Sequence, residues 1–200
     1  MAGVVTRGFK GRRDPSAPKL PPGQYLTRDF PVLSAGPTPE IPLDQWRFTI
    51  TDETGGRHAW RWQELLDLPS EQPTLDIHCV TKWSKLGTRW EGVSLDTLLS
   101  SVGTSATHAL VHSYGGYSTN LPLADLRDGK AWIAYRYEGE DIPGEHGGPA
   151  RLLVPHLYFW KSAKWVCGIE LRAEDTPGFW ETMGYNNYGD PWREQRYTGD

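Results

Sequence analysis

The sequence predicts a mixed α+β fold in a single domain, and three observations lead to it. The 200 residues suit one domain with a hydrophobic core of its own. Strand-like segments, in which bulky apolar and polar residues alternate, recur along the chain. The helical patterns between them are short, and neither an internal repeat nor a domain boundary interrupts them. We therefore expect a strand-rich sheet or barrel-like core with short helices at intervals.

The strands are expected where apolar and polar residues alternate or where a short apolar run occurs. In WRFTI, the bulky residues Trp46, Phe48 and Ile50 alternate with Arg47 and Thr49, and the following TDETGG is typical of a turn. The other segments follow the same patterns. The expected strands are residues 46–50, 57–62, 74–80, 108–114, 131–137, 150–156 and 164–171.

Three short helices are expected, each with a start or a stop signal. Pro69 stops the first helix. Ser94 is suited to cap the second, because its hydroxyl can accept a hydrogen bond from an amide of the first turn. Pro122 suits the first turn of the third helix. These helices fall within residues 62–70, 95–102 and 123–128.

The two ends of the chain differ in composition from the middle. Residues 1–24 are rich in glycine, proline and basic residues and are predicted to form an N-terminal arm. Residues 25–190 are the predicted domain, and residues 191–200 are predicted as a C-terminal tail. Because no apolar core follows the basic residues of the arm, neither a secretory nor a twin-arginine signal is expected. No apolar run approaches the ~20 residues that a membrane span needs.

Charge and cysteine content narrow the class of protein further. The formal net charge of −4 argues against a general nucleic-acid-binding surface. Two cysteines cannot build a disulfide scaffold. Such low cysteine use fits a reducing compartment, so we expect a cytoplasmic protein.

The segment LDIHCVTKWSKLGTRWEG contains the first candidate site residue, Cys79. No acidic residue lies in residues 77–90, and three basic residues follow the cysteine: Lys82, Lys85 and Arg89. Nearby cations favour the thiolate, which ligates soft metals or attacks electrophiles, whereas a lone free cysteine is commonly a small buried apolar residue. The local sequence supports both interpretations equally. A zinc site is not expected, because His78 and Cys79 are adjacent and point to opposite faces of a strand.

The second candidate is EHGGPARLLVPHLYFWKSAKWVCGIE. No acidic residue lies between Glu145 and Glu170, and the glycines at 147–148 leave room for a ligand to approach the backbone. The segment carries five basic or imidazole side chains: His146, Arg151, His156, Lys161 and Lys164. This composition suits a phosphate-bearing cofactor, or else a solvated basic loop between two strands.

Two further segments each allow two interpretations. Arg28 in YLTRDFPVL either extends over the same anionic site or forms a surface ion pair, for example with Asp29. The aromatic and asparagine residues of FWETMGYNNYG form either a sugar or peptide platform, or a tail that packs Phe179 and Trp180 on the core. Packing is the favoured reading of the tryptophans.

Taken together, these segments resemble the sulfite oxidase-type molybdopterin-dependent oxidoreductases, in particular compact bacterial members with only the molybdopterin-binding domain. The resemblance covers roughly residues 25–190. LDIHCVTKWS is similar to the family strand that ends in a molybdenum-ligating cysteine, and HGGPARLLVPHLYFWKSAKW is similar to a long family block that binds the pterin. The resemblance implies the mixed, strand-rich fold of that domain and a molybdenum–molybdopterin cofactor (Mo-MPT).

The resemblance also implies roles for individual residues. Cys79 would ligate molybdenum, and Tyr185 would lie near the metal. Arg28 would face the substrate oxyanion. The residues implied to contact the cofactor are Thr27, Arg28, Asp29, Phe30, Cys79, Ser113, His146, Arg151, Ser162, Ala163 and Lys164.

Some positions depart from the sulfite-oxidising pattern. Asp29 and Phe30 stand where the family has asparagine and histidine. Residues 80–83, with the sequence VTKW, replace an Ala–Gly–Asn–Arg run and are nearer to the methionine-sulfoxide-reductase branch. Since these positions shape the substrate pocket, sulfite is not assured as the substrate.

The expected reaction is two-electron oxygen-atom transfer between molybdenum and a small sulfur- or nitrogen-containing substrate. Arg28 would anchor an anionic substrate, and Tyr185 would donate a hydrogen bond to the reacting oxygen. Electrons would pass through a separate partner, since the sequence has neither a haem-binding Cys–x–x–Cys–His nor a dinucleotide fingerprint.

Two other classes of function stay open from the sequence. One is a non-catalytic anion- or sugar-binding module that uses the tryptophans. The other is a thiol enzyme that pairs Cys79 with His78 or His112. Cys167 lies in an apolar strand and is expected in the core.

Overall fold

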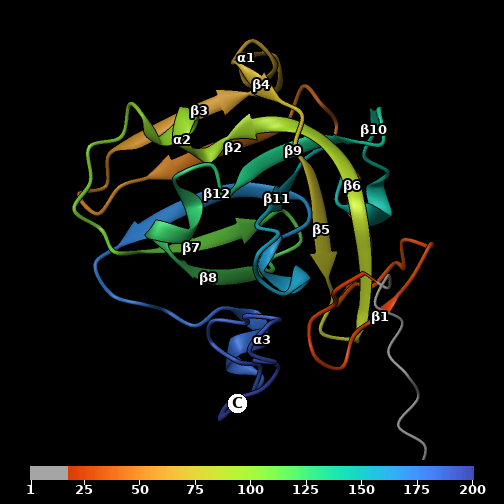
Figure 1. Cartoon of the computed structure of the whole chain (residues 1–200). Coiled ribbons are helices and arrows are strands. Elements are labelled where there is room, and N and C mark those ends of the chain that lie inside the picture. The colour runs from red at the N-terminus through yellow and green to blue at the C-terminus, as the bar shows by residue number, and fades with distance from the viewer. Residues whose placement is uncertain (1–17) are drawn as a thin grey trace, which may run out of the picture.

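Two facing β-sheets build the protein. The structure, a computed structural model, describes residues 18–200, so most of the predicted N-terminal arm, residues 1–17, lies outside the described residues. One sheet has five strands and the other has seven (Figure 1). Short helices lie between the strands, and the fold is the strand-rich α+β arrangement that the sequence predicts.

The five-stranded sheet has the order β3-β2-β12-β7-β8. β12 runs parallel to β2 and antiparallel to β7, so the last long strand of the chain lies at the centre of this sheet. In β2, Phe48 and Ile50 are buried while Arg47 and Thr49 are half-buried, which is the expected alternation. The bounds are β2 Arg47–Thr51, β3 Arg57–Arg61, β7 His108–Ser113, β8 Ser118–Pro122 and β12 Val166–Arg172.

The seven-stranded sheet is organised around β6. This long, curved strand pairs with β1, β4, β5 and β9 (Figure 1). β6 is not among the predicted strands, because its bulky apolar residues, at positions 83, 86, 90 and 93, do not alternate with polar ones. The bounds are β1 Tyr25–Leu26, β4 Ser70–Glu71, β5 Thr74–His78, β6 Trp83–Ser94, β9 Trp132–Tyr137, β10 Glu140–Asp141 and β11 Arg151–Leu153.

The helices are short and follow the predicted capping signals. The Ser94 hydroxyl accepts a hydrogen bond from the Asp96 amide at 3.2 Å and caps α2, as predicted. After Pro122 the chain forms a single 3₁₀ turn where a helix over residues 123–128 was expected. The α-helices are α1 Trp62–Leu66, α2 Leu95–Leu99 and α3 Phe179–Thr182, and the 3₁₀ helices are Leu123–Leu126, Gly144–His146 and Phe159–Lys161.

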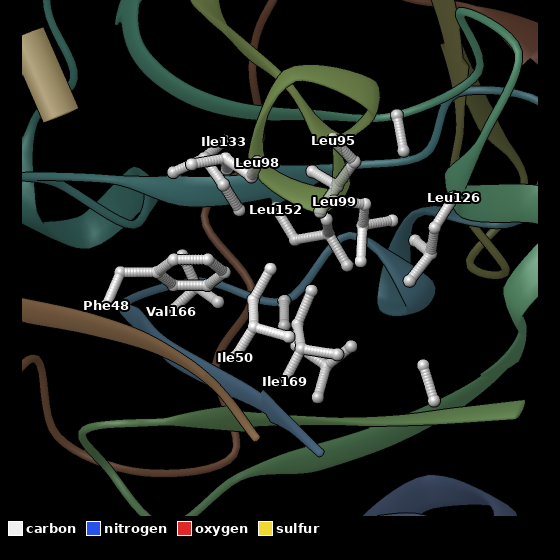
Figure 2. Close-up of a cluster of buried hydrophobic side chains, with 14 of the residues drawn as sticks. Phe48, Ile50, Leu95, Leu98, Leu99, Leu126, Ile133, Leu152, Val166 and Ile169 are labelled. Atoms are coloured by element: carbon white, nitrogen blue, oxygen red, sulfur yellow. The ribbon is translucent and has the colours of Figure 1, made fainter. Parts of the chain in front are cut away.

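The larger hydrophobic cluster fills the space between the sheets. Figure 2 shows Phe48, Ile50 and Ile169 from the five-stranded sheet facing Ile133 and Leu152 from the other sheet. All five side chains are at most 1% exposed, so this contact holds the two sheets together by the removal of apolar surface from water.

A second, smaller cluster of aromatic residues lies around Cys79. It contains Trp83, Trp90, Trp132 and Phe159, all less than a tenth exposed, with Phe30 packed against it. This cluster connects β5, β6 and β9 to the 3₁₀ helix that begins at Phe159. The tryptophans here serve as core residues, and they fix the wall against which the cysteine lies.

Across residues 18–200, no helix combines the length and the apolar character that crossing a membrane would require.

Gly92 is a point where two strands approach closely. A Cβ atom at this position would lie 2.4 Å from the Ile133 carbonyl oxygen and 2.7 Å from the Ala134 Cα. We expect Gly92→Ala to lower the free energy of unfolding by about 1–3 kcal/mol, because backbone cannot move aside cheaply. Urea unfolding measures this. Gly103→Ala is the matched control, since its Cβ would meet nothing within 4 Å. Equal stability of the two variants would contradict the close approach at Gly92.

Candidate functional site

A cavity of about 530 Å³ lies beside Cys79. Five separate segments of the chain line it: residues 30–39, 79–83, 115–117, 146–165 and 179–185. The basic side chains are His146, Arg151 and Lys164, and none of the lining residues in the described part of the chain is acidic. The volume is in the range of cofactor and small-molecule sites. Its lining makes it a site for an anionic ligand.

Eight of the twelve predicted site residues meet at this cavity. They come from segments that are more than a hundred residues apart in the sequence. The eight are Phe30, Cys79, His146, Arg151, Ser162, Ala163, Lys164 and Tyr185.

Four predicted site residues are not brought to the cavity: Thr27, Arg28, Asp29 and Ser113. Arg28 and Asp29 are exposed, and Thr27 accepts a hydrogen bond from the Asp29 amide. The short strand β1 runs along the edge of β6 before this segment, which leaves the Arg28 side chain at the surface. Ser113 ends β7 and is buried, and the residues that follow it at 115–117 line the cavity in its place.

Cys79 lies at the end of β5 and at the start of a tight turn. Its amide donates to the Trp83 carbonyl at 2.9 Å, and its carbonyl accepts from the Lys82 amide at 3.0 Å. The Thr81 hydroxyl lies 3.1 Å from Sγ and donates to it. Cys79 is 7% exposed, and burial raises the pKa of its thiol, while Thr81 and the Arg196 charge act in the opposite direction. The sulfur therefore faces the cavity as a shielded soft donor.

Lys85 and Arg89, which follow Cys79 in the sequence, do not line this cavity. Lys85 donates to the Arg28 carbonyl at 2.5 Å, and Arg89 forms an exposed ion pair with Glu138 at 2.9 Å. The reason is that these residues lie on β6, which carries them along the sheet and away from the sulfur. The cations whose charges interact with Cys79 are Lys164, in the cavity wall, and Arg196, 117 positions away in the predicted tail.

Arg151 is the buried cation of the cavity wall. Its side chain donates to the carbonyls of His146 and Ser162, each at 2.7 Å, and its guanidinium lies 4.1 Å from the centre of the Phe159 ring. Arg151 is 1% exposed, and its Nε is buried without a partner in the described residues. Burial lowers the pKa of Arg151. A buried positive charge without a carboxylate beside it favours an anion in the cavity.

His146 and Lys164 extend the same wall. The His146 ring stacks on Phe30 at 4.0 Å between centroids, and its Nδ1 is buried with no partner among residues 18–200. Lys164 donates to the carbonyls of Leu33 and Glu145 at 2.8 and 2.5 Å. Burial and the Arg151 charge lower the pKa of Lys164 to about 8. The positive charges of Arg151 and Lys164 repel each other, and an anionic ligand bound between them would reduce this repulsion.

Aromatic side chains form another part of the lining. Tyr185 stacks on Trp180 at 5.0 Å and meets the edge of Trp160 at 5.1 Å. Burial raises the pKa of Tyr185, and the charges of Tyr197 and Cys79 act in the same direction. The phenol therefore stays protonated at neutral pH and can donate a hydrogen bond into the cavity.

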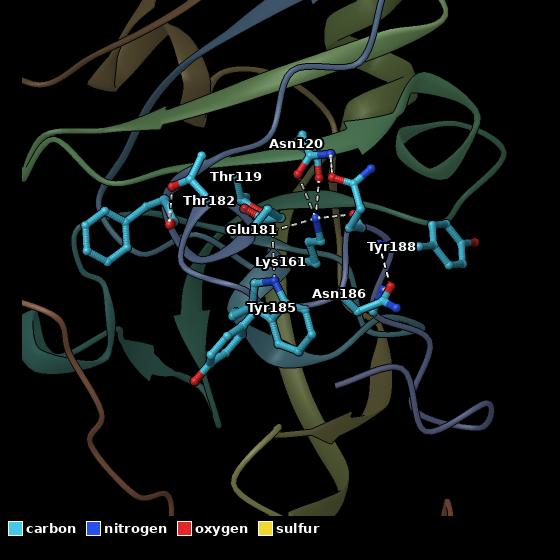
Figure 3. Close-up of polar contacts among 12 residues, drawn as sticks. Thr119, Asn120, Lys161, Glu181, Thr182, Tyr185, Asn186 and Tyr188 are labelled. Carbon is cyan, nitrogen blue, oxygen red and sulfur yellow. Dashed lines mark hydrogen bonds and ion pairs between the residues drawn. The ribbon is translucent and has the colours of Figure 1, made fainter. Parts of the chain in front are cut away.

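A buried ion pair holds this aromatic segment in place. Lys161 Nζ lies 2.6 Å from Glu181 Oε1, and both side chains are 1% exposed (Figure 3). Glu181 also accepts hydrogen bonds from Thr119 at 3.0 Å and from the Trp160 indole at 2.9 Å. Lys161 further donates to the Asn120 carbonyl at 2.8 Å. α3, which carries Glu181, is thereby fixed to β8 and to the 3₁₀ helix before Ser162.

Sequence reasoning missed several residues of the site. Tyr117 lines the cavity, and Arg196 lies next to the Cys79 turn. Thr81, one of the residues 80–83 expected at the substrate pocket, does line the cavity. The Gly–Gly–Tyr run at residues 115–117 was an available signal, because glycine allows close approach of a ligand. No local signal points to Arg196, since its side-chain hydrogen bonds join it to Val80 and Pro22, far away in the sequence.

The alternative interpretations find little support in the geometry. Neither His78 nor His112 lines the cavity: His78 lies 2.8 Å from the Ser84 hydroxyl, and His112 lies 3.5 Å from Glu170. Of the ten tryptophans, all in the described residues, only Trp192 is exposed. These positions argue against a Cys–His pair and against a tryptophan-rich sugar surface.

Comparison with known proteins identifies the family. The family model for the oxidoreductase molybdopterin binding domain matches residues 35–180, which is most of the chain. The chain belongs to this family. The family and the fold class that were predicted from the sequence are therefore confirmed. The matched range begins after Thr27, Arg28, Asp29 and Phe30.

Individual relatives agree with this assignment. The chain is 38% identical to uncharacterized oxidoreductase YuiH of Bacillus subtilis over 194 residues, which cover 96% of this chain and 98% of that protein. It is 27% identical to a putative protein-methionine-sulfoxide reductase subunit, YedZ1, of Azospira oryzae, covering 84% of this chain and 66% of that one. It is 22% identical to human mitochondrial sulfite oxidase, with coverage of 84% and 38%.

A solved structure shares the fold. The sulfane dehydrogenase SoxCD of Paracoccus pantotrophus superposes with a TM-score of 0.62 at 19% identity, covering 70% of this chain and 41% of that chain. The chain thus spans nearly all of the Bacillus relative and about two fifths of the SoxCD chain and of human sulfite oxidase.

The buried ion pair gives a stability prediction. We expect Lys161→Met to lower the free energy of unfolding by about 3–5 kcal/mol, because it leaves the Glu181 carboxylate buried without its cation. The double variant with Glu181→Met should recover part of this loss. Urea unfolding measures both. Arg89→Met is the control, because its ion pair with Glu138 is exposed and contributes about 0–1 kcal/mol. A loss at Lys161 no larger than at Arg89 would contradict this account.

The pKa of Lys164 gives a pH prediction. Below about pH 8 its ammonium is charged and attracts an anion, and above this pH the charge is lost. We expect cofactor-free protein to bind sulfate roughly tenfold more weakly at pH 9 than at pH 7, since about a tenth of Lys164 stays charged one unit above its pKa. Sulfate keeps its charge over this range, and calorimetric titration measures its affinity. Lys164→Gln should bind weakly at both pH values. An unchanged wild-type affinity would speak against the assigned charge.

Proposed function

We propose that this protein is a molybdenum–molybdopterin oxidoreductase that catalyses two-electron oxygen-atom transfer on a small sulfur- or nitrogen-containing substrate. The observation that carries this proposal is the cavity, which a thiol and three basic side chains face and which, within residues 18–200, no acid lines. Such a lining suits an anionic cofactor with a soft-ligated metal. Membership of a molybdopterin-binding family supports the same cofactor.

The residues of the cavity fit Mo-MPT. Cys79 would supply the protein ligand to molybdenum, because its sulfur is a soft donor that faces the cavity. Arg151, His146 and Lys164 would hold the pterin and its phosphate. Buried, unpartnered nitrogen atoms on Arg151 and His146 are the kind of donor or acceptor that a bound cofactor would satisfy. Phe30, Ser162 and Ala163 complete this part of the lining.

When bound, Mo-MPT supplies the two-electron redox chemistry and the exchangeable oxygen. The protein binds and orients it and shields the site from water. Tyr185, whose phenol is protonated at neutral pH, would donate a hydrogen bond to the oxygen of the substrate. Reduction of a sulfoxide would take up two electrons and two protons and release water.

An uncharged substrate is favoured over sulfite. Arg28, the expected anchor for an anionic substrate, is exposed and contributes nothing to the lining. The lining includes the partly exposed apolar side chains of Leu33 and Phe179, which are 48% and 39% exposed. These apolar side chains suit a sulfoxide or an N-oxide better than a dianion. The similarity to a putative protein-methionine-sulfoxide reductase subunit supports this choice.

The proposal includes a separate electron-transfer partner. The chain offers no haem-binding motif of the Cys–x–x–Cys–His type, so electrons would enter from another protein. The cytoplasmic location inferred from the low cysteine content is likewise part of the proposal.

Metal and pterin analysis tests this function. Protein made in a host that synthesises molybdopterin should contain about one molybdenum per chain. Cys79→Ser should lose most of the molybdenum, because the hydroxyl is a poor soft-metal ligand, while Cys167→Ser should retain it as the matched control. Activity would then be screened with sulfite, sulfoxides and N-oxides.

The rival functions give different results in the same experiment. Wild-type protein repeatedly free of molybdenum and pterin, yet able to bind glycans, would favour a binding module. Inactivation by alkylation with no metal present would favour a thiol enzyme.

A further inference from the structure

Arg196 connects the C-terminal segment to the turn that holds Cys79. Its Nη1 donates to the Val80 carbonyl at 2.6 Å, and its Nη2 donates to the Pro22 carbonyl at 3.2 Å. The guanidinium lies 5.0 Å from the centre of the Tyr158 ring. Arg196 is 6% exposed, so these contacts are shielded from water and from salt.

The turn that Arg196 contacts is unusual. Lys82 has a φ of 79°, a conformation that side chains with a Cβ adopt rarely and at a cost. Such a conformation persists only where the surroundings fix it. The Lys82 amide and carbonyl are held by Cys79 and Tyr25, and Arg196 is the partner of the Val80 carbonyl between them.

Arg196 is only partly neutralised. Its Nε lies 3.6 Å from Glu194, whose side chain is 50% exposed. Water around that carboxylate weakens its effect, whereas the Arg196 charge acts on the buried Cys79 sulfur. One side chain therefore supplies both a clamp, that is, a hydrogen bond that holds the turn, and a positive charge at the residue next to the cysteine.

Arg196 is also connected to Tyr185. Its carbonyl accepts from the Asn186 amide at 3.1 Å, and the next residue, Tyr197, forms an isolated bridge with Tyr185. The segment around Arg196 thus contacts both the turn at Cys79 and the backbone beside the phenol.

We propose that Arg196 is a positioning residue of the site: it fixes the Cys79–Lys82 turn by its hydrogen bond to Val80 and places a positive charge beside the metal-ligating sulfur. This inference rests on the proposed function, since it assigns the charge to a molybdenum-bound thiolate. It gives residues 191–200, predicted only as a tail, a role in the chemistry of the cavity.

Three variants of the molybdenum-loaded protein separate the clamp from the charge. Arg196→Met removes both, Arg196→Lys keeps the charge but not the planar two-pronged donor, and Arg193→Met removes an exposed arginine of the same segment. The readouts are hydrogen exchange of the amides in residues 79–83, measured also on molybdenum-free protein, and the molybdenum reduction potential followed spectroscopically.

The expected results differ between the variants. Arg196→Met should exchange the turn amides about tenfold faster, as for loss of a charge-assisted hydrogen bond. Its reduction potential should move to more negative values, because a nearby positive charge favours the added electron. Arg196→Lys should show intermediate exchange and a nearly wild-type potential. Arg193→Met should leave both readouts unchanged.

Failure of this inference can be told from failure of the proposed function. Wild-type protein without molybdenum would overturn the proposed function and the charge beside a metal-bound sulfur with it. If molybdenum-loaded Arg196→Met shows the same amide exchange rates and the same reduction potential as the wild type, this inference alone is overturned. The same holds if Arg193→Met changes both readouts as much as Arg196→Met does. If Arg196→Met fails to fold, Arg196→Lys is used for the test instead. Amide exchange in residues 79–83 of Arg196→Lys at the wild-type rate would contradict the clamp.

Discussion

The buried contact between Lys161 and Glu181 is the constraint on which the site depends. Both charges are buried, so the loss of hydration of each is offset only by its partner. The hydrogen bonds around them further restrict the positions of the two side chains. Because Glu181 lies in α3 and Lys161 precedes Ser162, this one pair sets the aromatic segment with Tyr185 against the basic segment with Arg151. These two segments line the cavity together with residues 30–39, 79–83 and 115–117.

The lining of the cavity divides according to chemistry. Arg151, His146 and Lys164 bring cationic and imidazole groups that suit an anionic cofactor, while Tyr185 and Phe179 bring aromatic surface and a phenol. Leu33 and Phe179 add partly exposed apolar side chains to the lining. Reactivity and selectivity would then be set by different segments of one small domain.

Local patterns predicted much of the fold but not its organising strand. β2 could be predicted because Phe48 and Ile50 alternate with polar neighbours. α2 could be predicted because Ser94 is a favourable N-cap residue. β6 was missed, since the bulky apolar residues in its sequence do not show the alternation on which strand prediction depends. Charged residues nearby in the sequence were also a poor guide to the cavity. Lys85 and Arg89 follow Cys79 in the sequence, but they lie on β6 and do not line the cavity.

The sequence by itself determined the fold class, the family and eight of the residues that line the cavity, because motifs such as HGGPAR and SAKW encode local backbone and side-chain chemistry. Only the tertiary structure decided which charges act on Cys79. It placed Arg28 at the surface and brought Arg196 to the turn after the cysteine. The physical reason is that electrostatic effects depend on distance and burial in space, and neither quantity can be read from separation along the chain.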